Sequence, residues 1–229
     1  MGQSAAKRLA GETAAQWITS GMHIGLGTGS TTAYAIRAIG RRIREEGLMV
    51  RGVPTSSSAE LLAREHGLPL CSLDNVTGLL DVALDGADEV SPALDLIKGR
   101  GAAHTCEKLV ARQAKRFVVL IDPSKQVDQL GSKMPLPIEV MPMAAGVIMR
   151  SLDAMGAKGE LRMGLRKDGP VVTDQGFWVI DAWFDKIDNP EVLDSVILAM
   201  PGVLDHGLFV QIATDVIVGT PDGVQVLTR

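Results

Sequence analysis

The stretch MHIGLGTGSTTAYAIRAIGRRIREEG, residues 22–47, predicts a strand, a glycine turn and a helix in immediate succession. Residues 22–27 form a short apolar run, which is typical of a buried strand. After the glycines, Ile36, Ile39 and Ile43 recur at helical spacing and leave the arginines of the segment for solvent. The stretch therefore predicts the first β-α unit of an α/β fold.

The glycine turn GLGTGST, residues 25–31, departs from two common nucleotide-binding patterns. A dinucleotide fingerprint requires glycine where Ser30 stands, and a nucleotide P-loop requires lysine directly after Gly29. What remains is a turn that presents N–H groups and hydroxyls at the positive end of a helix, which suits a small phosphate. On these residues alone, a phosphate site and a plain strand-to-helix turn are equally supported.

The same alternation of strand and helix continues through the first half of the chain. Strands are expected at 49–56, 80–85 and 116–122, a short apolar segment at 95–99, and helices at 4–19, 58–67 and 105–115. Strands separated by helices predict βαβ units and a Rossmann-like, doubly wound, mainly parallel sheet.

The pattern changes where prolines cluster, near residues 131–142. Beyond that point we expect a strand, a helix at 144–155, strands near 160–166 and 177–184, a helix at 190–200 and a further strand. This is the order of a ferredoxin-like α+β domain. Asn189 and Pro190 are suited to the cap and first position of the second helix. The chain ends with two strands around a TPDG turn.

The sequence thus predicts two domains. The first spans residues 1–134 together with about 206–229, and it is expected to be Rossmann-like and catalytic. The second, smaller α+β domain spans residues 135–205.

The composition is that of an ordinary globular protein of 229 residues, with 46% hydrophobic and 22% charged residues. There are 23 lysines and arginines against 27 aspartates and glutamates, so no excess of positive charge is present to neutralise a nucleic-acid backbone. The first residues lack the apolar core of a signal peptide, and no apolar run reaches the length of a membrane span. We therefore expect a cytoplasmic protein that binds neither nucleic acid nor membrane.

Cysteine and histidine lack the spacing of a metal site. Cys71 and Cys106 form no CxxC pair, and the four histidines form no HxxxH pair. We therefore expect neither a metal centre nor a disulfide framework.

A second polar segment, DGADEV at residues 85–90, follows a predicted strand. Asp85 and Asp88 stand just past the carboxyl end of that strand, where open α/β sheets bind ligands. Taken by itself, the segment is better explained as an Asp-Gly turn that leads into a solvated acidic loop.

A third polar segment is KGRGAAHTCEK, residues 98–108. Lys98 ends a short apolar segment, and Glu107 lies about two helical turns further on. A glutamate near a lysine and two aspartates provides the groups for proton transfer beside a stabilised oxyanion. The alternative is a glycine turn with a surface Glu107–Lys108 pair, but three such segments at successive strand-to-helix connections favour a functional site.

The motifs GTGST, DGADE, KGRGAA…EK, DPSKQVDQLG, PLPIEV and GTPDGV occur in this order, and with them the chain resembles the type A ribose-5-phosphate isomerases over essentially its whole length. The resemblance implies a cytoplasmic aldose–ketose isomerase of carbohydrate metabolism. Such enzymes interconvert ribose 5-phosphate and ribulose 5-phosphate in the non-oxidative pentose phosphate pathway. It further implies no metal or organic cofactor, a Rossmann-like domain with a smaller α+β domain, and a homodimer or homotetramer.

The resemblance also implies roles for individual residues. Glu107 matches the general base that moves a proton between C1 and C2 through a cis-enediolate, Lys98 the cation near the oxyanion, and Asp85 the carboxylate of ring opening. The substrate-binding positions that it implies are Thr28, Gly29, Ser30, Thr31, Asp85, Gly86, Ala87, Asp88, Lys98, Gly99, Arg100, Gly101, Lys125 and Lys7.

The chain departs from the common family pattern at two places. Arg100 stands where many members have glycine, and TDQGFW, residues 173–178, replaces the familiar TDNGN. Two other hypotheses are an amino-sugar-phosphate deaminase or CoA-transferase relative, and a regulatory domain that senses sugar phosphates without turnover. The sensor would need an output segment such as a DNA-binding helix-turn-helix, and the residues of the chain supply none.

Overall fold

A computed structural model describes residues 2–220 and 222–229, and the chain divides into two compact units. The first unit comprises Met1–Ala87, Cys106–Lys125 and Ile212–Arg229. The second comprises Asp88–Thr105 and Gln126–Gln211.

The first unit contains a six-stranded sheet in the order β13-β12-β6-β3-β1-β2. Its strands are β1 (His23–Leu26), β2 (Arg51–Pro54), β3 (Val82–Gly86), β6 (Phe117–Ile121), β12 (Asp215–Thr220) and β13 (Gly223–Thr228). All neighbours pair in parallel except β12 and β13. The expected mainly parallel, doubly wound sheet is therefore confirmed. Its strand order reverses between β1 and β3, which is where ligands bind in such sheets.

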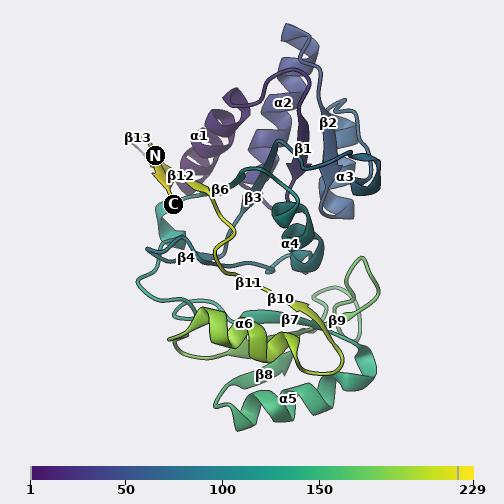
Figure 1. Cartoon of the computed structure of the whole chain (residues 1–229), viewed down its shortest axis with the longest axis vertical. Helices are drawn as coiled ribbons and strands as arrows, with labels where there is room; N and C mark the ends of the chain where they lie inside the picture. Colours follow the sequence, from purple (N-terminus) through teal and green to yellow (C-terminus); the bar gives the residue numbers. More distant parts are fainter. Residues whose placement is uncertain (1, 221) are drawn as a thin grey trace. The chain divides into compact units, whose positions relative to one another are not determined.

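Helices cover both faces of this sheet (Figure 1). They are α1 (Gln3–Gln16), α2 (Thr32–Glu46), α3 (Ser57–Glu65) and α4 (His104–Arg112). Ile24 and Leu26 of β1 belong to a core shared with α1, α2 and α3. Gly25 lies between them and faces the opposite side, where a Cβ atom would stand 2.5 Å from Val110 of α4. The glycine therefore lets α4 approach the sheet closely.

The second unit contains a four-stranded antiparallel sheet in the order β10-β7-β9-β8. Its elements are β7 (Leu136–Val140), α5 (Ala145–Ala154), β8 (Lys158–Leu161), β9 (Trp178–Trp183), α6 (Pro190–Leu198) and β10 (Val203–His206). This is the expected ferredoxin-like sequence of elements. The Asn189 side chain accepts the Val192 N–H at 3.1 Å, which confirms the predicted cap of α6.

Alternating residues of β7 divide between the two faces of that sheet. Leu136, Ile138 and Val140 share a core with residues of α5 and α6. Pro137 and Glu139 consequently lie on the face away from these helices. In the register of the sheet, Pro137 pairs with Asp181 of β9, so the same face also carries this carboxylate.

A small third sheet, β11-β5-β4, explains why residues 88–105 cluster with the second unit. It consists of β4 (Glu89–Val90), β5 (Leu96–Ile97) and β11 (Leu208–Phe209). The division expected at residue 134 leaves 88–105 in the first domain and returns to that domain near 206. In the structure, β5 pairs with both β4 and β11. Residues 88–105 and 206–211 therefore both belong to the second unit.

Several elements differ in extent from the predictions. The first helix ends at Gln16 and not at residue 19, and β8 ends at Leu161 and not at 166. The segment after Leu161 instead turns through two glycines, because the N–H of Gly164 bonds to the carbonyl of Gly169 at 3.0 Å. In the expected TPDG turn, Pro221 lies outside the described residues. Three short 3-10 helices, η1 (Leu73–Asn75), η2 (Pro123–Lys125) and η3 (Pro142–Ala144), complete the elements.

The segment that departs from the family pattern forms a tight turn. The N–H groups of Gly176 and Phe177 donate to the carbonyl and hydroxyl oxygens of Thr173 at 2.9 and 3.1 Å. Gly176 has φ +87°, a conformation that favours glycine. The turn is therefore formed with phenylalanine at position 177.

Among the helices described, none combines the length and the apolar character needed to cross a bilayer.

Candidate active site

The glycine turn connects β1 to α2 at the switch point of the parallel sheet. Gly29 has φ +123°, and the N–H of Ala33 donates to its carbonyl at 3.0 Å. The helical hydrogen bonding of α2 therefore begins directly at the turn. The first N–H groups of a helix have no acceptor within the helix and carry a partial positive charge. Together with the exposed Ser30 and the buried Thr31, they suit an anion.

Asp85 joins the carboxyl ends of β3 and β1. Its Oδ1 accepts the backbone N–H of Thr28 at 3.0 Å and that of Gly86 at 2.7 Å, and the residue is only 2% exposed. A Cβ atom at Gly27 would overlap the Asp85 carboxyl group. Glycine at position 27 is therefore what allows the carboxylate to reach the turn.

Two hydroxyls that the sequence analysis missed also contact this turn. Thr28 Oγ1 lies 2.6 Å from Ser56 Oγ and 3.0 Å from Thr55 Oγ1. Ser56 in addition caps α3 by accepting the N–H of Ala59 at 3.1 Å. The available signal was their position just past β2, because the carboxyl ends of neighbouring parallel strands meet at one edge of a sheet.

One predicted basic residue contacts the turn within the first unit, and a second lies in the short helix η2. Lys7 Nζ donates to Ser30 Oγ at 3.2 Å. Lys125 ends η2, directly after Ser124, whose N–H and hydroxyl both donate to Asp122. The predicted Lys7 and Lys125 thus come from α1 and from the segment that follows β6.

Asp122 organises this basic edge. Burial raises the pKa of Asp122, but hydrogen bonds from Ser124 and Gln3 outweigh burial and bring the pKa below its ordinary value. The positive charge of Lys7 lowers this pKa further. An ionised carboxylate therefore binds Gln3 and Ser124 and attracts the charge of Lys7, and neither Gln3 nor Ser124 was expected from the sequence.

Glu107 is buried in the first turn of α4, with 4% of its surface exposed. The interpretation of Glu107 as half of a surface pair with Lys108 is therefore wrong, since Lys108 is also only 5% exposed. A buried carboxylate on a helix packed against β1 is shielded from bulk water, which suits proton transfer to a bound molecule.

Lys98 lies in the second unit and is 2% exposed. Its N–H donates to the carbonyl of Gly207 at 2.9 Å, and a Cβ atom at Gly207 would overlap the Lys98 carbonyl oxygen. Its ammonium nitrogen stands 5.3 Å from the centre of the Phe209 ring. Gly207 directly precedes β11 and Phe209 belongs to it. The small sheet therefore fixes both the backbone and the ammonium group of Lys98.

Lys98 opens a tight turn through Ala102, which we call the Lys98 loop (residues 98–102). Within it the N–H of Ala102 donates to the carbonyl of Gly99 at 3.0 Å. The N–H of Arg100 donates to Asp88 Oδ2 at 3.0 Å, and the guanidinium of Arg100 is 3.9 Å from the same carboxylate. Arg100, the departure from glycine, is thus a largely exposed side chain paired with Asp88.

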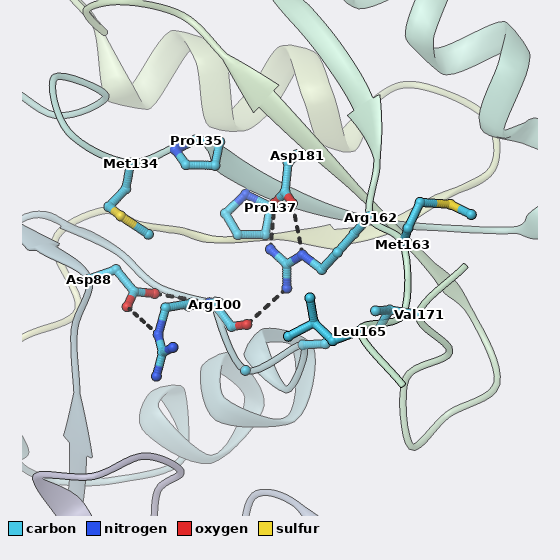
Figure 2. Close-up of a pocket in the computed structure, with 12 residues that line it drawn as sticks. Asp88, Arg100, Met134, Pro135, Pro137, Arg162, Met163, Leu165, Val171 and Asp181 are labelled. Carbon is cyan, nitrogen blue, oxygen red and sulfur yellow. Dashed lines mark hydrogen bonds and ion pairs between the residues drawn. The ribbon is translucent and has the colours of Figure 1, made fainter. Parts of the chain in front are cut away.

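A cavity of about 520 Å³ adjoins the Lys98 loop within the second unit. Figure 2 shows Arg162 reaching across it from Asp181 toward the loop, with Asp88 and Arg100 at the other side. Arg162 and Asp181 were not predicted as site residues, since neither lies in a glycine-rich or acidic motif.

The predicted residues thus fall into two groups. Thr28, Gly29, Ser30, Thr31, Asp85, Gly86, Ala87, Glu107, Lys125 and Lys7 belong to the first unit, and Asp88, Lys98, Gly99, Arg100 and Gly101 to the second. Within residues 2–220 and 222–229, no three His, Cys, Asp or Glu side chains are grouped as a metal would require.

Comparison with known proteins gives one consistent result. Residues 51–223 match the model of the family described as ribose 5-phosphate isomerase A (phosphoriboisomerase A). The chain is 51% identical to ribose-5-phosphate isomerase A of Thermosynechococcus vestitus, over 93% of this chain and 90% of the relative. It is also 51% identical to that of Pyrococcus horikoshii, over 97% of each chain.

Solved structures agree with these relatives. A D-ribose-5-phosphate isomerase in complex with phospho-erythronic acid has a TM-score of 0.98 to this chain at 50% identity, with both chains fully covered. Ribose 5-phosphate isomerase A of Methanocaldococcus jannaschii has a TM-score of 0.96 at 45% identity, again over 100% of both chains.

Proposed function

Because the chain belongs to the ribose 5-phosphate isomerase A family, we propose that Glu107, Asp85 and Lys98 carry out its reaction. The protein is an isomerase that interconverts ribose 5-phosphate and ribulose 5-phosphate in the pentose phosphate pathway. The observation that carries the residue assignment is the hydrogen bond from Thr28 to Asp85. It joins a carboxylate to the glycine turn that suits a phosphate, at the switch point of the sheet.

The phosphate of the substrate is proposed to bind the glycine turn. Ser30 and Thr31 offer hydroxyls and helix N–H groups, while Lys7 and Lys125 offer positive charge. Phosphate far from the reacting carbons serves as a handle whose binding energy orients them. Gly29, Gly86 and Ala87 complete this side through their backbones.

The sugar ring is proposed to open at Asp85. Opening moves the proton of the anomeric hydroxyl away and supplies a proton to the ring oxygen, which leaves C1 as an aldehyde. Asp85 is suited to the first part, because two N–H groups orient its carboxylate at the mouth of the turn. Asp88 and the backbone of the Lys98 loop, including Gly99, Arg100 and Gly101, would contact hydroxyl groups of the open chain.

Isomerisation then needs one carboxylate and one cation. Glu107 removes the proton from C2, and the C–H electrons form the C1–C2 double bond of a cis-enediolate whose negative charge rests on O1. Lys98 stabilises that charge. Glu107 returns its proton to C1, O2 becomes the ketone oxygen, and the O2 proton passes to O1. Donors aimed at a developing oxyanion are among the largest contributions to catalysis.

A homodimer or homotetramer in the cytoplasm is proposed as the working form. The short helix η3 and the helices α5 and α6 leave apolar side chains exposed, among them Met143 (85%), Val147 (56%) and Val192 (57%). Neither Cys71 nor Cys106 forms a disulfide, which supports the proposal of a reducing compartment. The net charge of −4 supports an enzyme without a nucleic-acid partner.

The direct test is the isomerase assay on chelator-treated protein, with ribulose 5-phosphate followed as it forms. We expect turnover to survive chelation and Glu107→Gln to lower kcat by at least ~10²-fold. Glu65→Gln, at an exposed glutamate of α3, is the matched control and should leave kcat unchanged. Full activity of Glu107→Gln would overturn the base assignment, whereas ammonia release from glucosamine 6-phosphate without ribulose 5-phosphate would favour the deaminase hypothesis.

A further inference from the structure

We propose that Arg162, oriented by Asp181, is a positioning residue that holds the Lys98 loop in its active conformation. The inference rests on the proposed role of Lys98, and it adds two residues to which no catalytic function has been given above. Both lie in the second unit with the loop itself.

The guanidinium of Arg162 bonds on two sides at once (Figure 2). Its Nη1 donates to the carbonyl of Gly99 at 2.9 Å and to that of Arg100 at 3.0 Å. Its Nε donates to Asp181 Oδ2 at 2.8 Å, and its Nη2 donates to Asp181 Oδ1. One planar group thus connects the ferredoxin-like sheet to two successive carbonyls of the loop.

The loop needs such support because its backbone is strained. Gly99 has φ +103° and Ala102 has φ +58°, which is uncommon for a residue with a side chain. A Cβ atom at Gly99 would lie 2.7 Å from the His104 ring, so the loop is also closely packed. Strained conformations persist only where surrounding bonds fix them, and here the two carbonyls that Arg162 holds come just before the strained Ala102.

The strained turn begins one residue after Lys98. A change at Gly99 would therefore turn the Lys98 backbone and displace its ammonium group. A misplacement of about 1 Å of a catalytic group costs on the order of 10²-fold in rate. Arg162 contributes through this geometry, since it reaches the loop through backbone carbonyls and not through the lysine side chain.

Asp181 is needed to fix the guanidinium. The side chains of Arg162 and Asp181 are 16% and 20% exposed, so the pair is largely withdrawn from water. The two-point contact sets the plane of the guanidinium and directs Nη1 at the loop. A lysine at position 162 would keep the charge, but a single ammonium cannot hold Asp181 and two carbonyls in this arrangement.

The first experiment separates positioning from binding by steady-state kinetics. We expect Arg162→Met to lower kcat by about 10- to 100-fold while KM changes less than about threefold. Arg162→Lys should recover little of the loss, and added guanidinium ion at low millimolar concentration should restore part of the activity of Arg162→Ala. Arg166→Met, an exposed arginine four residues further on, is the matched control and should behave as the wild type.

The second experiment measures binding without turnover, with phospho-erythronic acid as the probe because its carboxylate is anionic like the enediolate. Introduced alone, Arg162→Met should weaken the binding of phospho-erythronic acid at least ~10-fold. Introduced into Lys98→Met, it should weaken that binding by less than about twofold. Affinity for inorganic phosphate should be unchanged in all these variants. If Arg162→Met does not fold, Asp181→Asn, which keeps the shape of the side chain, takes its place.

The outcomes distinguish this inference from the proposed function. An equal loss of affinity in both backgrounds, or a full recovery of kcat by Arg162→Lys, would overturn the positioning role. A Lys98→Met enzyme with wild-type turnover and binding would instead overturn the assignment of Lys98, whatever the behaviour of Arg162.

Discussion

The backbone N–H of Thr28 donates to the Asp85 carboxylate at 3.0 Å, across 57 residues of sequence. Thr28 lies just past β1 and Asp85 lies at the carboxyl end of β3, and between these neighbouring strands the order of the parallel sheet reverses. The bond therefore fixes the distance between the glycine turn and the first carboxylate of the site. In the proposed mechanism, the glycine turn at one end of this bond binds the phosphate. Asp85 at the other end opens the sugar ring.

Gly27→Ala should break this relationship. The added Cβ atom would overlap the Asp85 carboxyl group, so the carboxylate must move away from the N–H of Thr28. We expect kcat/KM to fall by at least ~10²-fold, as for a misplaced catalytic group. Gly146→Ala is the control, since the nearest atom to its Cβ is the end of the Arg150 side chain at 3.7 Å. Wild-type kinetics in Gly27→Ala would contradict the role of Asp85.

Lys7→Met should weaken substrate binding and leave the chemical step intact. Lys7 Nζ bonds to Ser30 Oγ beside the proposed phosphate turn, and a hydrogen bond to a charged group contributes about 1.5–3 kcal/mol. We therefore expect KM for ribose 5-phosphate to rise by about 10-fold or more, with kcat within about threefold. Inhibition by inorganic phosphate should weaken in parallel.

The adjacent Arg8 offers a matched control for that change in charge. Arg8 is exposed and lies 4.0 Å from Glu12, away from the turn. Arg8→Met should leave KM unchanged. Equal effects at both positions would indicate that general positive charge, and not a phosphate contact of Lys7, attracts the substrate.

Glu89→Gln should destabilise the second unit. Glu89 is fully buried, and its carboxylate accepts the N–H groups of Gly131, Lys133 and Met134 at 2.6 to 2.7 Å. A glutamine turns an NH2 group toward at least one of these donors and leaves a buried N–H unsatisfied. We expect the free energy of unfolding to fall by about 2–4 kcal/mol in urea denaturation. Glu45→Gln, at an exposed glutamate, should change it by less than ~0.5 kcal/mol.

Asp215→Asn should reduce stability in a pH-dependent way. Burial raises the pKa of Asp215, but hydrogen bonds from Arg116 and Thr214 and the charge of Arg116 outweigh it and lower the pKa below its ordinary value. A carboxyl whose pKa is lower in the folded state stabilises the fold above its unfolded pKa of about 3.9. That stabilisation is lost as the pH falls from about 4 through the folded pKa.

The measurement is the free energy of unfolding of wild type and Asp215→Asn at several pH values. At pH 7 the variant should be less stable by about 1–3 kcal/mol, because charge-assisted bonds to Arg116 at 2.9 and 3.2 Å are lost. The difference should shrink below pH 4. A difference that is constant down to pH 2 would show that ionisation of Asp215 contributes nothing.

Local patterns predicted the elements that carry strong periodicity or a distinct cap. The spacing of Ile36, Ile39 and Ile43 indicated α2, and all three pack in or against the core of the first unit. Asn189 indicated the start of α6 and caps it. Such signals depend on neighbours in the chain, so a single sequence contains them. The run near residue 160 lacked them, and β8 ended earlier than expected.

The site residues divide in the same way. The glycine turn, the DGADEV segment and the Lys98 segment were found because each lies at the carboxyl end of a strand and contains glycine. Ser56 was missed because a serine before a helix is most often only a cap, and here it both caps α3 and contacts Thr28. Arg162 was missed because nothing in its local sequence distinguishes it from other arginines that follow a strand.

The sequence by itself determined the order of the main helices and strands, the two architectures and the glycine-rich segments at the strand ends, since periodicity, capping and turn chemistry act over a few residues. It did not indicate the short strands β4 and β11. Only the tertiary structure decided that residues 88–105 join the second unit, that Asp85 meets Thr28, and that Arg162 reaches the carbonyls of Gly99 and Arg100. Those relationships arise from strand pairing and side-chain reach across distant parts of the chain. The physical reason is that a hydrogen bond depends on position in space, which residues far apart in sequence acquire only when the sheets form.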